Sequence, residues 1–176
     1  MTLTIAARIV ARRTLALAAA LLTLTALTAP AAAVDSPRLS IPALNVDNAV
    51  AQFPLNGVSW NIDPWFSGVG HLQGTAWFDQ GGNVAIGGHS WMPDHTPGIF
   101  VALHTLQPGD TITVSYGGSE RQYTVSSVTS VAIDDLSVLH PTDSERLTLI
   151  TCDGASYDRS SNLYERRVIV VAERSG

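Results

Sequence analysis

The sequence predicts an all-β domain, folded as a sandwich or a closed barrel, behind an N-terminal export segment. Beyond residue 34, short runs rich in Val, Ile, Leu and Thr are separated by Gly, Pro, Asn and Asp. This pattern is typical of short strands joined by turns. Only one short helix is expected in that part, around Ile99–Leu106. A domain of about 140 residues is long enough to bury a hydrophobic core without disulfides.

The N-terminal segment is set apart by its charge. Three Arg residues precede an uncharged stretch of 21 residues, positions 14–34, which ends in three Ala and a Val. A basic start, an apolar run and a small-residue site are the three regions of a secretory signal. Cleavage after Ala33 would release a soluble domain, whereas the uncleaved stretch is just long enough to span a bilayer of about 30 Å. We therefore expect residues 1–34 to be a signal peptide or a membrane anchor, and residues 35–176 to work outside the cytoplasm.

Turn residues and alternation define the strands. The first contains Pro42, which cannot donate to a ladder, so we expect it at a sheet edge. The Gly117-Gly118 pair predicts a hairpin between Asp110–Tyr116 and Arg121–Val128. The last two expected strands, Arg146–Cys152 and Arg167–Ala172, are rich enough in branched residues for a buried sheet. The expected strands are Arg38–Leu44, Asn83–Gly88, Asp110–Tyr116, Arg121–Val128, Arg146–Cys152 and Arg167–Ala172.

One connection is long for a compact domain. Residues Thr129–Glu145 separate two expected strands, and loops of this length are usually functional or mobile. Its apolar members Ile133, Leu136 and Val138 either line a groove for substrate or plug one end of the sheet structure.

Composition excludes several classes of protein. The 176 residues carry 15 acidic and 10 basic side chains, for a formal net charge of −5. No basic patch is therefore available for nucleic-acid phosphates. A single Cys rules out an internal disulfide and a cysteine-based structural zinc site.

That single cysteine is the first candidate for chemistry. Cys152 ends an expected strand and shares a face with Thr148 and Ile150, while Thr151 points to the other face. An inert buried thiol is the ordinary alternative. An exported protein that keeps one unpaired thiol suggests a reactive group, which needs a base or a cation to favour the thiolate.

Two side chains fit those roles. Among five His residues, His89 is the best placed, because the run Asn83–Gly88 delivers it at a strand end beside two glycines. Arg167 opens the last strand on the same side as Ile169, and a guanidinium that faces an apolar surface needs an anionic partner. A developing oxyanion would serve, and a surface ion pair is the alternative.

Together these residues resemble the sortase family, the cysteine transpeptidases of bacterial cell surfaces. The sequence Thr148–Cys152 reads TLITC and fits the family signature TLxTC around the nucleophile in full. Residues Gly82–Ser90 look like the segment that ends in the catalytic His, and Tyr164–Ala172 is similar to the final strand with its Arg. The stretch Trp91–Asp94 is bulkier than the family pattern, and we expect it to reshape the pocket.

The resemblance implies a closed eight-stranded barrel with one or two short helices, tethered to the cell membrane. Such an enzyme would cleave a motif similar to LPxTG on surface proteins and form a thioester on Cys152. An amine from a peptidoglycan precursor or a pilin would then resolve the thioester. His89 would be the general acid and base, and Arg167 would hold substrate and stabilise the oxyanion. Thr151 and the loop residues Ile133, Leu136 and Val138 would contact the sorting motif.

No cofactor and no metal are implied. Some relatives bind calcium, but the sequence offers no convincing cluster of acidic ligands. Two other functions stay open. One is a different exported Cys–His enzyme such as an L,D-transpeptidase, although Thr151-Cys152-Asp153 does not match that family's motif. The other is a non-catalytic binding barrel in which Cys152 is inert.

Overall fold

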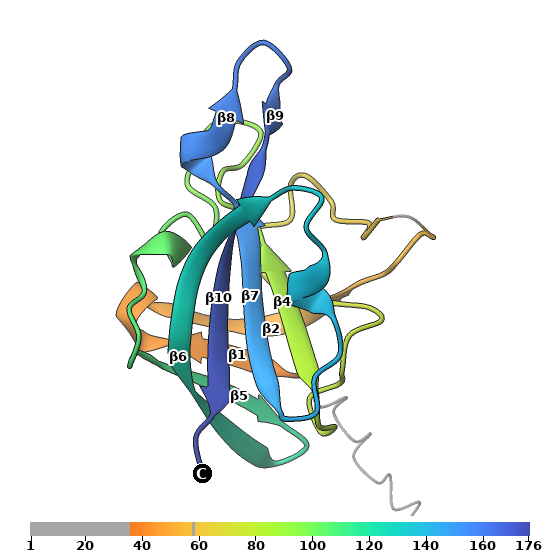
Figure 1. Ribbon diagram of the computed structural model, residues 1–176, viewed down its shortest axis with the longest axis vertical. Coiled ribbons are helices and arrows are strands. Elements are labelled where there is room, and N and C mark those ends of the chain that lie inside the picture. Colours follow the sequence, from red (N-terminus) through yellow and green to blue (C-terminus); the bar gives the residue numbers. More distant parts are fainter. Residues whose placement is uncertain (1–35, 58) are drawn as a thin grey trace, which may run out of the picture. The chain divides into compact units, whose positions relative to one another are not determined.

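The computed structural model describes residues 36–57 and 59–176. Eight strands close into a barrel in the order β1-β2-β3-β4-β7-β10-β6-β5. In Figure 1, β6, β10, β7 and β4 stand side by side, and β1, β2 and β5 cross behind them. The barrel strands are β1 Arg38–Ile41, β2 Val46–Phe53, β3 Val69–Leu72, β4 Asn83–Gly88, β5 Thr111–Tyr116, β6 Ser119–Ala132, β7 Arg146–Cys152 and β10 Arg166–Arg174. The predicted all-β closed barrel of eight strands is confirmed.

Small elements complete the described part of the chain. A two-stranded hairpin, β8 Tyr157–Asp158 and β9 Leu163–Tyr164, stands above one end of the barrel (Figure 1). Four short 3₁₀ helices occur within residues 36–57 and 59–176, more than the one or two expected. They are η1 Pro42–Leu44, η2 Leu103–Thr105, η3 Ser137–Leu139 and η4 Gly154–Ser156. η2 falls inside the segment for which a helix was predicted.

Three strand predictions need correction. β1 is not an edge strand, because barrel closure pairs it with both β2 and β5. It ends before Pro42, which opens η1 instead of lying inside the strand. β6 continues to Ala132, so Thr129–Ala132 belongs to a strand and the connecting loop is shorter than expected. β2 and β3 were not predicted.

Alternation along each strand separates an interior face from an outer face. Side chains of the central strands fill the interior, and among them are Val84, Ile86, Leu147, Leu149, Val168 and Val170. A second, smaller group lies on the outer face. We call it the outer apolar cluster; it comprises Phe53, Leu72 and Ala85, with Trp60, Ile62, Phe66, Leu139 and Ile150 partly buried against them. Cys152 shares the strand face of Ile150, so the outer face is the one that carries the thiol.

The predicted signal or anchor, residues 1–34, lies outside the described residues, as does Asp35. Each described helix is three residues long, and none of them has the length and hydrophobicity that a membrane crossing requires.

Candidate active site

Cys152 and Arg167 face each other across one ladder. They are direct partners in the antiparallel pairing of β7 with β10. Side chains of directly opposed residues lie on the same face with Cβ atoms about 4.5–5.5 Å apart. The guanidinium is therefore brought to the thiol by strand register, which is fixed along seven consecutive pairs from Arg167–Cys152 to Glu173–Arg146.

His89 follows the neighbouring strand at the same end of the barrel. β4 and β7 run parallel, and their last ladder pair is Gly87 with Ile150. His89 lies two residues beyond Gly87, as Cys152 lies two residues beyond Ile150, so both leave the barrel side by side. Thr151 reinforces this end, because its Oγ1 donates to the carbonyl of Gly88 at 2.8 Å.

The backbone of His89 is tightly enclosed. Its carbonyl accepts the N–H of Phe100 at 3.0 Å, and the N–H of Gly98 donates to Ser90 O at 2.9 Å. A Cβ at Gly98 would lie 2.3 Å from the His89 carbonyl oxygen. Only glycine fits at position 98, so the segment after β4 fixes the backbone position from which the His89 side chain extends.

The imidazole is turned toward the loop between β2 and β3. His89 Nε2 donates to the carbonyl of Asp63 at 3.0 Å, which leaves Nδ1 as the acceptor nitrogen. Within the described part of the chain, no hydrogen bond joins His89 to Cys152. Catalytic hydrogen bonds are often long or misaligned before substrate binds.

The thiol of Cys152 is half-buried and unpaired. Burial raises the pKa of this thiol, since a thiolate loses hydration there, and the nearby Arg167 cation opposes the shift by lowering the pKa. The sulfur is therefore mainly protonated near neutral pH. It becomes nucleophilic only as a base removes its proton.

Arg167 has no acidic partner among the residues that the structure describes. Its Nη1 donates to the carbonyls of Tyr164 and Arg166, each at 3.0 Å. The surface ion pair considered from the sequence does not form. Backbone carbonyls orient the guanidinium and leave its positive charge uncompensated, as an oxyanion site requires.

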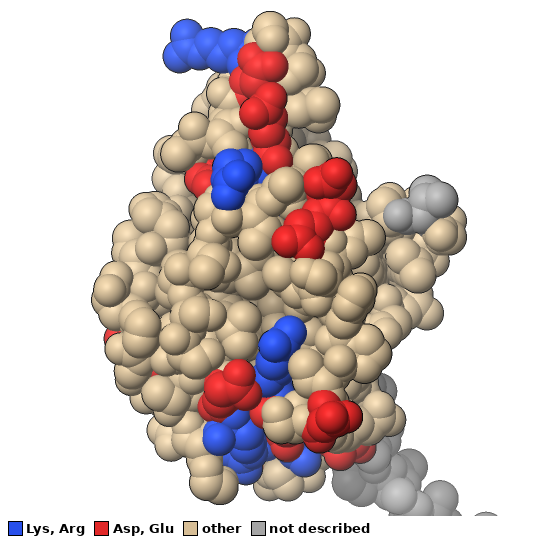
Figure 2. Space-filling model, viewed as in Figure 1, with Lys and Arg blue, Asp and Glu red and all other residues tan. Residues whose placement is uncertain are grey.

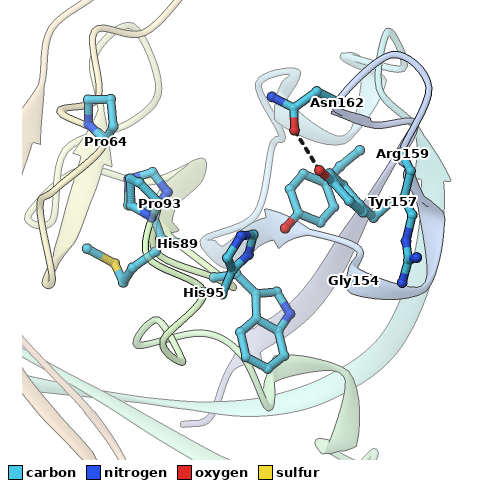
Figure 3. Close-up of a pocket in the computed structure, with 11 residues that line it drawn as sticks. Pro64, His89, Pro93, His95, Gly154, Tyr157, Arg159 and Asn162 are labelled. Atoms are coloured by element: carbon cyan, nitrogen blue, oxygen red, sulfur yellow. Dashed lines mark hydrogen bonds between the residues drawn. The ribbon is translucent and has the colours of Figure 1, made fainter.

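Two pockets adjoin at this end of the barrel. The hairpin pocket, about 830 Å3, contains His89; the mouth pocket, about 490 Å3, contains Cys152. Trp91 and Gly154 line both. Figure 3 shows the hairpin pocket, with His89 and Pro93 on one side and the side chains of Tyr157 and Asn162 across from them.

The predicted substrate contacts lie apart from one another. Thr151 is on the interior face, 4% exposed, and lines the mouth pocket. Ile133 and Leu136 are exposed on the loop after β6, and Val138 is half-buried. Leu139, rather than Val138, packs against the outer apolar cluster.

A buried amide holds that loop against the barrel. Asn83 Nδ2 donates to the carbonyls of Val138 and His140, at 2.9 and 3.1 Å. Asn83 Oδ1 accepts from Thr148 Oγ1 at 2.7 Å. Asn83 opens β4 and Thr148 lies within β7, so the two strands that carry His89 and Cys152 also position the loop.

The other histidines take ordinary or peripheral positions. His71 is buried, and its Nε2 donates to Ala76 O at 2.9 Å, which braces the turn after β3. Burial lowers the pKa of His71. His95 lines the hairpin pocket, and His104 is exposed and lines the mouth pocket. The described residues contain no group of three or more acidic, His or Cys side chains placed to hold a metal ion.

Sequence comparison identifies the family. The Sortase domain matches residues 39–175. The chain belongs to the sortase family. Over 92 residues it is 32% identical to sortase A of Staphylococcus aureus, which covers 51% of this chain and 43% of that protein. Less than half of that sortase is therefore matched.

Solved sortases share the fold. Sortase C-1 from Actinomyces oris superposes with a TM-score of 0.65 at 25% identity, over 82% of this chain and 76% of that chain. A Clostridium perfringens sortase D5 transpeptidase gives a TM-score of 0.63 at 23% identity, over 81% and 79% of the two chains. Sortase A from Corynebacterium diphtheriae gives 0.62 at 25% identity, over 81% and 61%.

Several residues around the site were not found from the sequence. Ser90, Gly98 and Gly154 carry no spacing signal of their own, because their roles depend on backbone segments that meet only in the fold. Trp91 was noticeable only as a bulky departure from the family pattern. Asn83 was placed on a strand, but nothing local to it predicts its contacts with a loop more than fifty residues away.

Proposed function

We propose that this sortase is a cysteine transpeptidase that cleaves a sorting motif similar to LPxTG and transfers the resulting acyl group to an amine. One observation carries the proposal. The ladder of β7 with β10 pairs Cys152 with Arg167, and the parallel neighbour β4 ends one residue before His89. Acyl transfer requires a nucleophile, a base and an oxyanion donor at one place, and this arrangement provides all three at one end of the barrel. Membership of the sortase family supports it.

Acylation follows from the positions of these groups. Cys152 Sγ attacks the carbonyl carbon of the motif Thr while its proton passes to His89, as expected of a thiol whose pKa is raised by burial. The carbonyl oxygen becomes an oxyanion beside the uncompensated Arg167 guanidinium. The C–N bond then breaks, the leaving amine takes the proton from His89, and a thioester remains on Cys152.

Transfer reverses the order of events. An incoming amine attacks the thioester carbonyl and gives a proton to His89. The C–S bond breaks, and the Cys152 thiolate regains a proton from the imidazolium. Thr151 and the loop residues Ile133, Leu136 and Val138 are proposed to contact the motif during acylation. Thr151 lines the pocket that contains Cys152, and Leu139 of the same loop packs against the outer apolar cluster.

Partners and location follow the same proposal. The donors would be surface proteins with a C-terminal sorting motif, and the acceptor an amine from a peptidoglycan precursor or a pilin. The uncharged stretch at residues 14–34 supports work outside the cytoplasm, on the membrane if uncleaved or released if cleaved. The formal net charge of −5 argues against a nucleic-acid partner.

Mass spectrometry of the full chain after exposure to a panel of sorting peptides tests the proposal. We expect an acyl adduct on Cys152, released as a new amide when an amine is added. Cys152→Ala should abolish the adduct and His89→Gln should suppress it. Arg167→Lys should slow transfer despite its charge, because an ammonium lacks the planar fork.

The outcomes separate the alternatives. Rapid alkylation of Cys152 without an adduct from any sorting peptide would indicate a different Cys–His enzyme. Alkylation only in denaturant would indicate an inert thiol. Full activity of Arg167→Lys would remove the guanidinium from the mechanism.

A further inference from the structure

The strands that carry Cys152 and Arg167 have a second group of polar residues on their other face. β6, β10 and β7 are neighbours in the barrel (Figure 1). Cys152 and Arg167 lie on the outer face of this sheet. Ser130 of β6 is the ladder partner of the interior residue Val168, and Arg166 lies two positions before Val168. Ser130 and Arg166 therefore belong to the opposite face, behind the thiol and the guanidinium.

Arg166 binds Ser130 through two nitrogens. Its Nε donates to Ser130 Oγ at 2.9 Å, and its Nη2 donates to the carbonyl of the same serine. Ser130 Oγ donates in turn to Asp153 Oδ2 at 2.6 Å. A hydroxyl has one proton to give, so Asp153 takes that proton and Arg166 meets a lone pair. Within the described part of the chain no ion pair joins Arg166 to Asp153 directly, so the hydroxyl links them.

The main-chain carbonyl of Arg166 connects these contacts to the site. It accepts the N–H of Asp153 at 3.0 Å and Arg167 Nη1 at 3.0 Å, which uses both of its lone pairs. The N–H of Arg166 donates to Ser156 Oγ at 3.0 Å. Both main-chain polar groups of Arg166 and its side chain are therefore held, and the direction of its carbonyl is fixed.

The guanidinium of Arg167 depends on that direction. Nη1 makes its other hydrogen bond to the carbonyl of Tyr164, at 3.0 Å. An acidic partner could orient the guanidinium, but it would also neutralise the charge that an oxyanion needs. Carbonyls orient it and leave the charge available. A long side chain held in this way is only as well placed as the carbonyls that hold it, and small displacements at a reacting centre cost rate.

We propose that Ser130 and Arg166 are positioning residues for acyl transfer. Their contact behind the sheet, anchored on Asp153, fixes the Arg166 carbonyl and through it holds the Arg167 guanidinium beside Cys152. The catalytic consequence rests on the proposed function, whereas the position of the guanidinium can be measured without turnover.

The first experiment uses the thiol as a reporter of that position. The Arg167 cation lowers the pKa of the Cys152 thiol, so the midpoint of a pH series of iodoacetamide labelling rises when the cation moves away. The full chain is compared with Ser130→Ala, with Arg167→Gln and with the double variant. Asp153, His89 and Tyr164, the other titratable side chains beside the thiol, are the same in all four proteins.

Ser130→Ala should raise the midpoint in the same direction as Arg167→Gln and by less. In the Arg167→Gln background it should add nothing, because residues that act through one another are not additive. An unmoved midpoint in Ser130→Ala overturns the proposal. So does an equal shift in both backgrounds, because the serine then acts on the thiol without the guanidinium.

The second experiment measures the rate at which a sorting peptide forms the acyl-enzyme. Ser130→Ala should slow this step about tenfold, within the loss expected when a catalytic group is misplaced by less than 1 Å. Arg166→Lys should slow it by a similar factor although the charge is kept, because an ammonium lacks the fork that reaches both oxygens of Ser130. Ser130→Thr keeps a hydroxyl and should restore most of the rate.

Ser126→Ala is the matched control. Ser126 is also on β6 and its Oγ also donates to a β10 carbonyl, that of Val171, but it is exposed and makes no contact with Arg166. It should keep the parent rate and the parent midpoint. Variants at Ser130 and Arg166 that lose stability in urea yet keep both parent values would show a structural role only and overturn the proposal. A parent protein that forms no acyl-enzyme overturns the proposed function instead, and the labelling experiment still decides the positioning.

Discussion

Gly98→Ala is predicted to disable the proposed site by moving His89 without replacing any of the proposed reacting groups. The added Cβ would lie 2.3 Å from the His89 carbonyl oxygen and 2.7 Å from its carbonyl carbon. Both are backbone atoms, so no side-chain rotation relieves the contact. The nearest approach falls about 0.7 Å short of the 3.0 Å that real Cβ atoms keep.

The expected magnitude follows from that displacement. The backbone at His89 is held by Phe100 N–H and, through Ser90, by Gly98 N–H, so part of the shift must be taken up at the imidazole. Misplacing a catalytic group by close to 1 Å costs up to about 100-fold in rate, and we expect a loss of about 10- to 100-fold in acyl transfer. Overpacking should also lower the free energy of unfolding by about 1–3 kcal/mol.

Acyl-transfer assays with a sorting peptide and an amine measure the loss of rate, and urea denaturation measures the loss of stability. Gly81→Ala is the control, because its Cβ would meet nothing within 4 Å and its φ is not positive. It should keep both rate and stability. A Gly98→Ala protein that is folded and transfers at the parent rate would refute the argument that this backbone contact positions the imidazole.

Three further predictions follow from buried groups. Asn83→Ala should lower the free energy of unfolding by about 2–4 kcal/mol, since a buried side chain loses its three hydrogen bonds; a loss below about 1 kcal/mol in urea denaturation would contradict it. Iodoacetamide labelling of Cys152 should rise with pH to a midpoint above that of an ordinary cysteine, and Arg167→Gln should move the midpoint higher, because burial raises the pKa of the thiol and the Arg167 cation opposes that shift; an unmoved midpoint would exclude the cation's influence. The pKa of buried His71 is lowered, so its stabilising contribution is present above its ordinary pKa of 6.5 and is lost as pH falls below that value. Denaturation at pH 7.5 and 5 should show this loss, and His71→Gln should reduce it.

The strands closest to the site were predictable because their signals are local. Asn83–Gly88 and Arg146–Cys152 are apolar runs bounded by turn residues, and both have the bounds that the sequence indicated. β2 and β3 were missed for a physical reason. β2 mixes Asp, Asn and Gln with apolar residues, and β3 is four residues with a buried His, so their strand character comes from pairing with neighbours in the barrel.

Site geometry was predictable only in part. Alternation along β7 assigned Cys152 to the face of Ile150, and the strand pairing of Arg167 agrees with the side predicted for it. The loop contacts were harder, because η3 and the exposed turn before it place Leu139 inward and leave Ile133 and Leu136 outward. No periodic pattern determines which side of an irregular loop faces the protein.

Register is the feature on which the proposed chemistry depends. Side chains alternate with a period of two, so a slip of one residue between β7 and β10 would set Thr151 opposite Arg167 and turn Cys152 toward the interior. Seven pairs with β10 and five with β4 oppose such a slip, and the interior residues Leu147 and Leu149 add the cost of exposing apolar surface. Barrel closure also leaves these strands no free edge to re-pair. A protonated thiol, a half-buried imidazole and a guanidinium that has no acidic partner among the described residues do no chemistry alone. In the proposed mechanism they act together, because closure of the barrel fixes which residues end each strand.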